Sequence, residues 1–327
     1  MIQAALRILM LTNARDCSKN RKAPVVPSRT MFSYRHSFHA GNHADVLKHL
    51  ILISCLRYLT SAKETPLRLI DIQAGAGLYR LDGENHTHNE AAEGILPLWQ
   101  RHVVGSAVID ATPAALKDYL DLLLHFNPDG VLRKYPGSPF MAATFMRSQD
   151  HLHLFELHPT DSRLLANNVD NLPNAKHIQV VCNNGFTGLK ALLPPPSRRG
   201  LVLIDPSYEL KTDYAQVTAC MQDALQRFAT GCYLIWYPII PRLQAHELPR
   251  RLKTLAQQAG KKWLHATLSI GKDGARADHP HQGLRASGMV VINPPFVLHN
   301  QLQEALPALQ QPLPQGVGCG WHLESNI

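Results

Sequence analysis

A short apolar run that leads into small residues is the first pattern able to bind a ligand. It reads Leu69-Ile70-Asp71-Ile72-Gln73-Ala74-Gly75-Ala76-Gly77. Small side chains let the backbone approach a ligand closely, and glycine permits the tight turn that follows a strand. The Asp71 carboxylate could accept a hydrogen bond from an amino group of that ligand. A plain turn between a strand and a helix has the same composition, and this alternative stays open.

The glycine pattern also narrows the choice of nucleotide. A dinucleotide fingerprint requires G-x-G-x-x-G, but Leu78-Tyr79-Arg80 follows Gly77. S-adenosylmethionine has no pyrophosphate that needs such a cradle, so the sequence favours it over NAD as the cofactor. A nicotinamide-dependent oxidoreductase is therefore a distant alternative.

A second apolar run ends in an acidic residue and a proline, in the sequence Leu203-Ile204-Asp205-Pro206-Ser207-Tyr208. It is close to the Asp/Asn/Ser-Pro-Pro-aromatic signature of enzymes that methylate exocyclic amino groups. The carboxylate of Asp205 and the carbonyl of Pro206 could accept the two amino hydrogens, which turns the nitrogen lone pair toward the methyl donor. Tyr208 could stack on the base, a contact worth ~1–3 kcal/mol. An ordinary turn at a strand end is the alternative.

A third segment, residues 34–49, is rich in histidine. Metal binding would need His39 and His43 on one helix face, but Gly41 between them indicates a loop, so we predict no metal site. The mixture of aromatic, basic and amide side chains suits contact with a base, a phosphate or the carboxylate of a cofactor. Asp45 is expected to be the N-cap of the helix that follows.

Basic loops are candidates for holding RNA phosphates. Residues 271–288 are expected to form a mobile basic loop between strands, with a solvated hairpin as the alternative. The Ser197-Arg198-Arg199 turn could serve in the same way or be a plain surface turn. The substrate contacts that we predict are Tyr34, Arg35, Tyr208 and Arg285.

These motifs need a framework, and the apolar runs between them are typical of buried parallel strands. The expected strands are Leu67–Asp71, Leu152–Glu156, Ile178–Cys182, Leu201–Asp205, Cys232–Tyr237 and Met289–Asn293. The expected helices between them are Asp45–Ser61, Ser162–Asn168 and Tyr214–Ala229. Strands that alternate with helices predict a doubly wound α/β sheet.

One spacing in this framework is unusual. The acidic residue that holds a ribose usually lies about 20 residues beyond the glycine turn, but the first strand that ends in an acid after Gly77 ends at Glu156. We therefore expect a small helical subdomain at about residues 81–135, with helices at 91–102 and 113–126, inserted where it could grip the substrate.

Composition restricts the class of protein. The chain has 327 residues, enough for one large domain, and a formal charge of +8, which favours an anionic partner. Its six cysteines show no C-x-x-C pair, so a zinc site or a disulfide scaffold is not expected and a reducing cytoplasm fits. No apolar run reaches the ~18 residues of a membrane helix.

Residues 1–30 are expected to be a flexible basic extension or an untranslated stretch before Met31.

With these residues in place, the sequence from about Met31 onward resembles the RlmJ family of bacterial 23S rRNA adenine-N6 methyltransferases. The resemblance is carried in order by Met31–His49, Tyr135–Pro139, Phe155–Pro159, Ser197–Tyr208, Lys211–Tyr214, Trp236–Pro238, Ser287–Met289 and Ile292–Pro295. It implies a Rossmann-like class I methyltransferase fold at residues 31–327. It also implies a monomeric enzyme that modifies naked or partly assembled 23S rRNA.

The resemblance assigns roles to individual residues. Asp205 would accept the amino proton, with Pro206 and Tyr208 as the other catalytic residues, and Tyr34 would lie near the target adenine. The cofactor-binding residues would be Lys48, His49, Asp71, Gln73, Gly75, Ser138, Glu156, Asn184, Gly185 and Asp205. Glu156 would hold the ribose hydroxyls.

Three residues depart from the family pattern. Gln73 stands where a histidine is expected, Asn184 replaces an aspartate that would accept from the adenine amino group of the cofactor, and Ser207 replaces a proline. Glutamine and asparagine keep a carbonyl acceptor, so we expect retuned cofactor binding rather than its loss. A DNA adenine-N6 methyltransferase and a non-catalytic RNA-binding relative remain the alternatives.

Overall fold

A computed structural model describes residues 39–82, 90–104, 112–271 and 283–327 of the chain. The expectations for residues 1–30, Tyr34, Arg35 and most of the 271–288 loop lie outside the described residues. The fold below is that of the compact unit that spans residues 34–327.

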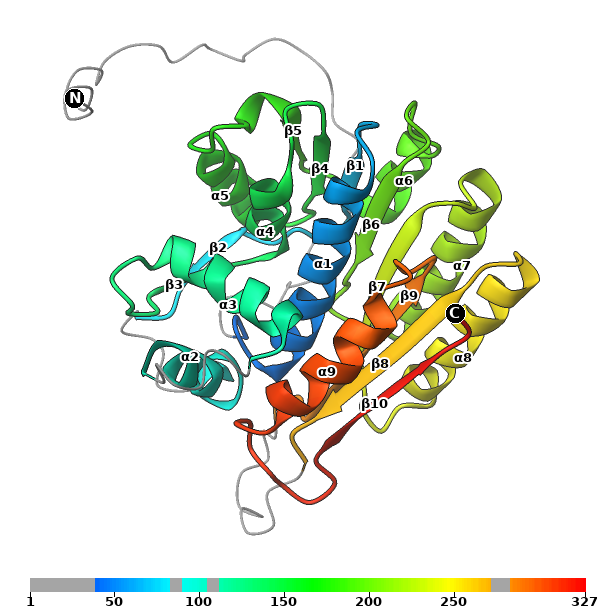
Figure 1. The fold of residues 1–327 in the computed structure, drawn as a ribbon. Helices are drawn as coiled ribbons and strands as arrows, with labels where there is room; N and C mark the ends of the chain where they lie inside the picture. The colour runs from blue at the N-terminus through cyan, green and yellow to red at the C-terminus, as the bar shows by residue number, and fades with distance from the viewer. Residues whose placement is uncertain (1–38, 83–89, 105–111, 272–282) are drawn as a thin grey trace, which may run out of the picture. The chain divides into compact units, whose positions relative to one another are not determined.

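An eight-stranded sheet forms the centre of this unit, with the strand order β10-β8-β9-β7-β6-β1-β4-β5 (Figure 1). Its strands are β1 (Arg68–Asp71), β4 (His151–Phe155), β5 (Ile178–Val181), β6 (Gly200–Ile204), β7 (Cys232–Pro238), β8 (Trp263–Ser269), β9 (Ala286–Ile292) and β10 (Gly320–Ser325). The five strands from β5 to β7 are parallel, whereas β9 is antiparallel to β7 and β8, and β10 is antiparallel to β8.

Strand β1 pairs with β4 on one side and with β6 on the other, so the strand order reverses between β1 and β6. Ligands of doubly wound sheets bind at the carboxyl ends of the strands at such a reversal. The predicted α/β sheet is thus confirmed, and the six expected strands are present. Strands β8 and β10, at the antiparallel side of the sheet, were not predicted.

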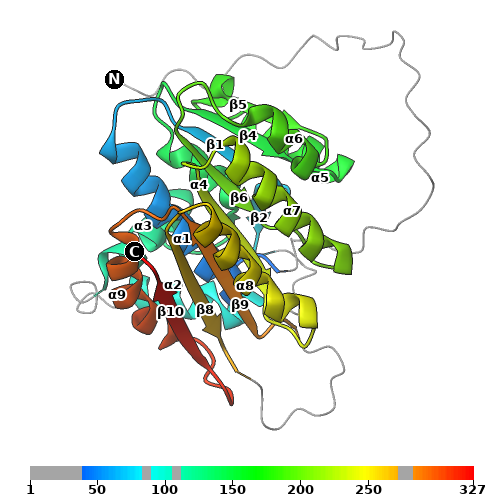
Figure 2. The same cartoon turned by 90° about the vertical axis from the view of Figure 1, so that its right-hand side faces the viewer.

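Two layers of helices cover the two faces of the sheet (Figures 1 and 2). On one face lie α1 (His43–Ala62), α3 (Ala114–Phe126), α4 (Ser138–Phe145), α5 (Pro159–Val169) and α9 (Leu298–Gln310); on the other lie α6 (Gly185–Leu192), α7 (Lys211–Arg227) and α8 (Leu243–Gln258). Strand β6 shows why its sequence is apolar throughout. Leu201 and Leu203 pack with the α1 layer, whereas Val202 and Ile204 pack with the α7 layer.

Helix α1 differs from its prediction at its first turn. The N-cap is Asn42, whose side-chain oxygen accepts from Asp45 N at 2.9 Å, so the expectation that Asp45 is the cap was wrong. Asp45 lies inside the first turn, and its carboxylate reaches back to accept from Gly41 N at 2.9 Å. This pair resembles a capping box, except that the bonded N–H belongs to Gly41 rather than to the N-cap. The other oxygen of Asp45, Oδ1, faces Lys48 in the next turn of α1.

The chain between β1 and α4 leaves the sheet and returns through a two-stranded ribbon. Strands β2 (Leu78–Arg80) and β3 (Lys134–Pro136) pair antiparallel, and Gly137 N donates to Gly77 O at 2.8 Å. Between them lie the 3-10 helix η2 (Glu90–Glu93) and the helices α2 (Ile95–Val104) and α3. Buried residues of α2 and α3 share the hydrophobic cluster of α1, so these helices extend the main core.

Candidate active site

The loop after β1 is organised around the buried carboxyl group of Asp71. Ser138 Oγ donates to one of its oxygens at 2.6 Å and Gln73 N to the other at 3.1 Å. Burial raises the pKa of Asp71 to about 6, against the opposing effect of these two hydrogen bonds. Asp71 and Ser138, both predicted to bind the cofactor, therefore contact each other although 67 residues separate them.

Glu156 closes the other side of this loop. Gly75 N donates to Glu156 Oε2 at 2.8 Å, and His158 N donates to Oε1 at 2.7 Å. Gly75 has φ +61, and a Cβ there would lie 2.4 Å from the hydroxyl of Tyr79, so both the backbone and the space require glycine. The helical insertion thus separates Gly75 and Glu156 in sequence, but the fold brings them into contact.

A buried ammonium group joins α1 to the end of β6. Lys48 Nζ lies 2.6 Å from Asp205 Oδ2 and 2.8 Å from Asp45 Oδ1. Burial acts to lower the pKa of Lys48, but the two carboxylates outweigh it and raise that pKa well above its ordinary value. Lys48 is therefore a permanent cation that fixes one oxygen of Asp205.

Gln73 links the two strand ends at the reversal of the sheet. Its Oε1 accepts from Asp205 N at 3.0 Å. The side chain of a residue after β1 thus orients the backbone of the first residue after β6. This contact uses the carbonyl oxygen of Gln73, the acceptor that glutamine retains in place of the expected histidine.

His49, predicted to contact the cofactor, takes part in an interior network. Its Nδ1 lies 2.7 Å from the hydroxyl of Tyr135, which lies 2.8 Å from that of Tyr119. All three side chains are buried. The network ties α1 to the helical insertion through Tyr119 and to β3 through Tyr135.

Tyr208 does not offer the open ring that stacking on a base requires. Its side chain is 2% exposed, and the ring packs on Tyr214 with 4.6 Å between centroids. Its hydroxyl donates to Trp236 O at 2.7 Å, and Arg242 Nη1 donates to its carbonyl at 3.1 Å. The expectation of a free stacking face was wrong, because these contacts turn the ring into the core under β7.

Asn184 and Gly185 stand where α6 begins. Asn184 Oδ1 accepts from Phe186 N at 2.9 Å, so it is the N-cap of α6 and its single acceptor already has a partner. A Cβ on Gly185 would lie 2.1 Å from the backbone oxygen of Ile72. Gly185 therefore allows α6 to approach the loop after β1.

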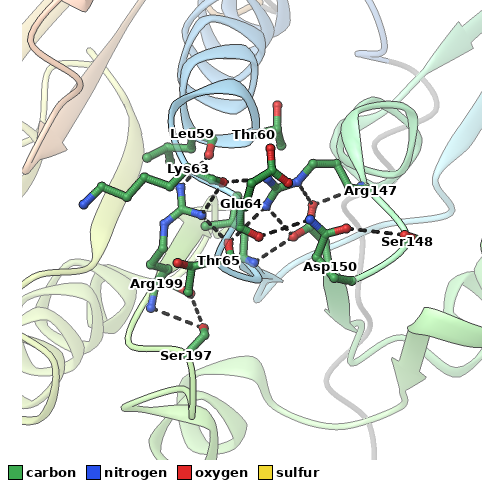
Figure 3. Close-up of polar contacts among 12 residues, drawn as sticks. Leu59, Thr60, Lys63, Glu64, Thr65, Arg147, Ser148, Asp150, Ser197 and Arg199 are labelled. Atoms are coloured by element: carbon green, nitrogen blue, oxygen red, sulfur yellow. Dashed lines mark hydrogen bonds and ion pairs between the residues drawn. The ribbon is translucent and has the colours of Figure 1, made fainter.

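The predicted phosphate contacts have protein partners where the structure describes them. Arg285 Nη1 lies 3.0 Å from both carboxylate oxygens of Glu93. Arg199 donates to the carbonyls of Leu59, Lys63 and Thr65 at the end of α1 (Figure 3). Arg199 of the predicted 197–199 turn thus clamps the end of α1, and the side chain of its neighbour Arg198 is exposed.

The sequence predicts no metal site in the histidine-rich segment. Within the described residues no group of three or more His, Cys, Asp or Glu side chains could hold a metal ion. His39 instead forms an ion pair with Glu90 at 3.0 Å. None of the helices in the described part of the chain combines the length and the apolar character of a membrane span.

One residue of this site, Asp45, was not predicted to belong to it. Asp45 was expected only to cap a helix, yet its carboxylate is the second partner of Lys48. The spacing of three residues on one helix is a signal for such a pair. Asp45, Lys48 and Asp205 together form a buried charge cluster at the carboxyl end of β6.

Comparison with known proteins places this arrangement in a family. A family model described as Ribosomal RNA large subunit methyltransferase D, RlmJ, matches residues 64–325. The chain is 44% identical to Ribosomal RNA large subunit methyltransferase J of Escherichia coli, over 88% of this chain and 96% of that protein. The namesake of Haemophilus influenzae is 43% identical over 90% of this chain and 98% of its own length.

A solved structure agrees with the sequence comparisons. The crystal structure of protein LPL1258 from Legionella pneumophila superposes with a TM-score of 0.74 at 32% identity, over 88% of this chain and 98% of that chain. The strand order is that of the expected Rossmann-like class I methyltransferase fold, which is therefore confirmed. From these matches and this topology, the chain belongs to the family of Ribosomal RNA large subunit methyltransferase D, RlmJ.

Proposed function

We propose that this protein transfers a methyl group from S-adenosylmethionine to the exocyclic N6 amino group of an adenine in 23S ribosomal RNA. The position of Asp205 carries the proposal: its carboxylate lies at the reversal of the sheet, held on one oxygen by Lys48. Family membership supports the same reaction, since the two curated relatives are named ribosomal RNA large subunit methyltransferases.

The side chains around the loop after β1 fit S-adenosylmethionine. Each Glu156 oxygen accepts one backbone hydrogen bond and keeps a lone pair for a ribose hydroxyl. The Asp71 carboxyl, buried and with its pKa near 6, suits a cationic amino group. Ser138, Gln73 and Gly185 contact or approach the same loop. We assign Lys48, His49 and Asn184 to the cofactor site with them, as the family resemblance implies. The cofactor supplies an electrophilic methyl group on a sulfonium.

Asp205 and Pro206 would orient the target amino group. Because Lys48 holds Oδ2, Oδ1 can accept one amino hydrogen, and the carbonyl of Pro206 can accept the other. The nitrogen lone pair then points at the methyl group, and Asp205 accepts the proton that leaves after transfer. Orientation of this kind supplies much of the rate in a reaction between two bound partners.

The net charge of the chain and its family membership support an RNA substrate and a cytoplasmic location. A formal charge of +8 favours a polyanion such as RNA. We infer that the protein acts as a monomer in the cytoplasm on naked or partly assembled 23S rRNA, and that Tyr34 and Arg35 contact this RNA. A base within RNA must be unpaired or flipped out of its stack to reach Asp205.

Transfer of tritiated methyl to protein-free 23S rRNA, followed by nucleoside mass spectrometry, tests the function directly. N6-methyladenosine is the expected product. Transfer only to duplex DNA would instead identify a DNA methyltransferase. Binding of rRNA with no transfer to either substrate would identify a non-catalytic RNA-binding relative.

Asp205→Ala separates the catalytic role from a role in cofactor binding. We expect loss of turnover by at least about 1,000-fold, since positioning and proton acceptance are both removed. The dissociation constant for S-adenosylmethionine, measured by calorimetry, should change by less than about threefold. Glu209→Ala, an exposed acidic residue of the same loop, is the matched control. A large loss of cofactor affinity in Asp205→Ala would show that Asp205 supports the cofactor pocket instead.

A further inference from the structure

The turn after β6, residues 205–208, carries the groups that the proposed reaction uses, and we call it the catalytic turn. Its first residue is held by two contacts. Asp205 N donates to Gln73 Oε1 at 3.0 Å, and Asp205 Oδ2 lies 2.6 Å from Lys48 Nζ. The start of the catalytic turn is therefore fixed by the loop after β1 and by α1.

The middle of the catalytic turn has no comparable support. Within the part of the chain that the structure describes, neither the carbonyl of Pro206 nor the N–H of Ser207 has a hydrogen-bond partner. A proline at position 207 would restrict φ, but serine does not. The direction of the Pro206 carbonyl, which accepts an amino hydrogen in the proposed reaction, therefore depends on how the turn is held at Tyr208.

Tyr208 has a backbone conformation that its surroundings must maintain. Its φ is +53°, in the left-handed region that residues with a Cβ rarely adopt. Such conformations persist where several contacts hold them, often at active sites. The Tyr208 ring packs on Tyr214, and its hydroxyl donates to Trp236 O at 2.7 Å. These contacts fix the side chain, whereas the peptide carbonyl needs a partner of its own.

Arg242 supplies that partner from the loop after β7. Its Nη1 donates to the carbonyl of Tyr208 at 3.1 Å. Burial raises the pKa of the Tyr214 phenol, and the nearby Arg242 charge acts against this rise, so the guanidinium lies beside both tyrosines. Among the described residues Arg242 forms no ion pair with a carboxylate. Its contact with the catalytic turn is therefore not a by-product of pairing with an acid.

The backbone of Arg242 is itself well anchored. Arg242 is the N-cap residue of α8, and its carbonyl accepts from Ala245 N at 3.1 Å. Ala245 and Leu248 are both 1% exposed, and they belong to the same hydrophobic cluster as Tyr208. A packed helix thus presents the guanidinium to the catalytic turn.

We propose that Arg242 is a positioning residue for methyl transfer, which holds the Tyr208 carbonyl and thereby aims the Pro206 carbonyl at the target amino group. This inference rests on the proposed function. Ser207 stands where a second proline is expected, so the guanidinium of Arg242 supplies rigidity that this proline would give. Tyr208 serves the reaction as an anchor in the core instead of a stacking surface.

Arg242→Ala tests this role in methyl transfer by the full chain to protein-free 23S rRNA. We expect kcat, expressed per S-adenosylmethionine-binding site, to fall by about 10- to 100-fold, because a displacement of about 1 Å can reduce a rate this much. The KM for RNA and the dissociation constant for S-adenosylmethionine should each change by less than about threefold.

Arg250→Ala is the matched control, because it removes the same charge from an exposed position of α8 and should leave kcat unchanged. If Arg242→Ala raised only the KM for RNA, Arg242 would be a phosphate contact and the inference would be overturned. An unchanged kcat in Arg242→Ala would overturn it as well.

Ser207→Pro provides a rescue that a general loss of stability would not predict. The φ of Ser207 lies outside the left-handed region, and its N–H has no partner in the described chain, so proline removes no hydrogen bond there. In Arg242→Ala, the added Ser207→Pro should restore kcat to within about threefold of Ser207→Pro alone. The same fold loss of kcat with and without Ser207→Pro would contradict the positioning role.

Crystal structures with S-adenosylhomocysteine keep the test independent of catalysis and of the behaviour of the proline variant. In Arg242→Ala, we expect Tyr208 to leave the left-handed region and the Pro206 carbonyl to rotate, whereas Arg250→Ala should keep both. If the wild type methylates no RNA but Arg242→Ala shows this change, the proposed reaction fails and Arg242 remains the anchor of the turn. A catalytic turn that is unchanged in Arg242→Ala would overturn the inference.

Discussion

At the scale of single residues, the site holds two buried ionisable groups with opposite behaviour. Lys48 keeps its charge because two carboxylates surround it, whereas burial raises the pKa of Asp71. The raised pKa has a cost in stability at neutral pH. Such a cost is retained where a function needs the ionised group, and in our proposal this function is to bind the amino group of the cofactor.

The pH dependence of stability tests the state of Asp71. Its pKa is about 6 in the fold and 3.8 ordinarily, so the folded protein keeps the proton to higher pH than the unfolded chain. The free energy of unfolding should therefore fall by roughly 1–3 kcal/mol as pH rises from about 4 to above 6, and then level off. Urea titrations should show that Asp71→Asn removes this component, whereas the exposed Asp170→Asn keeps it. If the free energy of unfolding of Asp71→Asn varied with pH as that of the wild type does, the raised pKa of Asp71 would be contradicted.

At the scale of elements, α1 connects the site, at the carboxyl ends of the strands, to the amino ends of β1 and β6. Its first turns carry Asp45 and Lys48, and its C-terminal end is held by two guanidinium groups (Figure 3). Arg147 donates to the carbonyls of Lys63 and Thr65, and Arg199 donates to these two and to Leu59. Cations at a helix C-terminus satisfy carbonyls that have no partner within the helix. This clamp fixes the helix that delivers Lys48 to Asp205.

Arg199→Ala tests the clamp. It removes three hydrogen bonds to carbonyl oxygens and should lower the free energy of unfolding by about 1–3 kcal/mol. Arg198→Ala is the matched control, because the adjacent Arg198 side chain is exposed and should change stability by less than about 0.5 kcal/mol. Both can be measured by chemical denaturation. Equal effects of the two substitutions would show that the contacts of Arg199 contribute little.

At the scale of the whole molecule, the hydrophobic cluster of the α1 layer supports one face of the sheet and the inserted helices together, and a second cluster covers the other face. The buried residues of the described chain begin at Ala40 and run to Leu313. Residues Leu98, Trp99, Leu116 and Tyr119 of the insertion belong to the same cluster as α1. The insertion and α1, which carries Lys48 of the site, are therefore stabilised as a unit.

Removal of residues 1–30 tests where this unit begins. A chain that starts at Met31 should unfold at the same denaturant midpoint as the full chain, because all the described core lies beyond it. Its turnover on 23S rRNA should also be unchanged, since Tyr34 and Arg35 are retained. A lower midpoint would show that the first thirty residues belong to the fold, and a raised KM for RNA with an unchanged midpoint would show that they bind substrate.

The sequence by itself determined the features that depend on local pattern. Apolar runs in alternation with helices were enough for the α/β sheet, because burial on both faces leaves no polar position in a strand such as β6. The strand-end acids Asp71, Glu156 and Asp205 could be located because ligands of such sheets lie at the carboxyl ends of strands. The long gap after Gly77 predicted that helices lie between β1 and β4.

Only the tertiary structure decided which side chains meet and which are covered. The ion pair between Lys48 and Asp205 joins residues 157 apart, and its existence depends on how α1 lies across β6. The ring of Tyr208 is buried by Tyr214 and Trp236, which a four-residue motif does not reveal. Asn42 rather than Asp45 caps α1 because the helix begins at His43, which places Asp45 inside the first turn. Partners distant in sequence are set by strand register and helix packing, and these emerge only when the whole core forms.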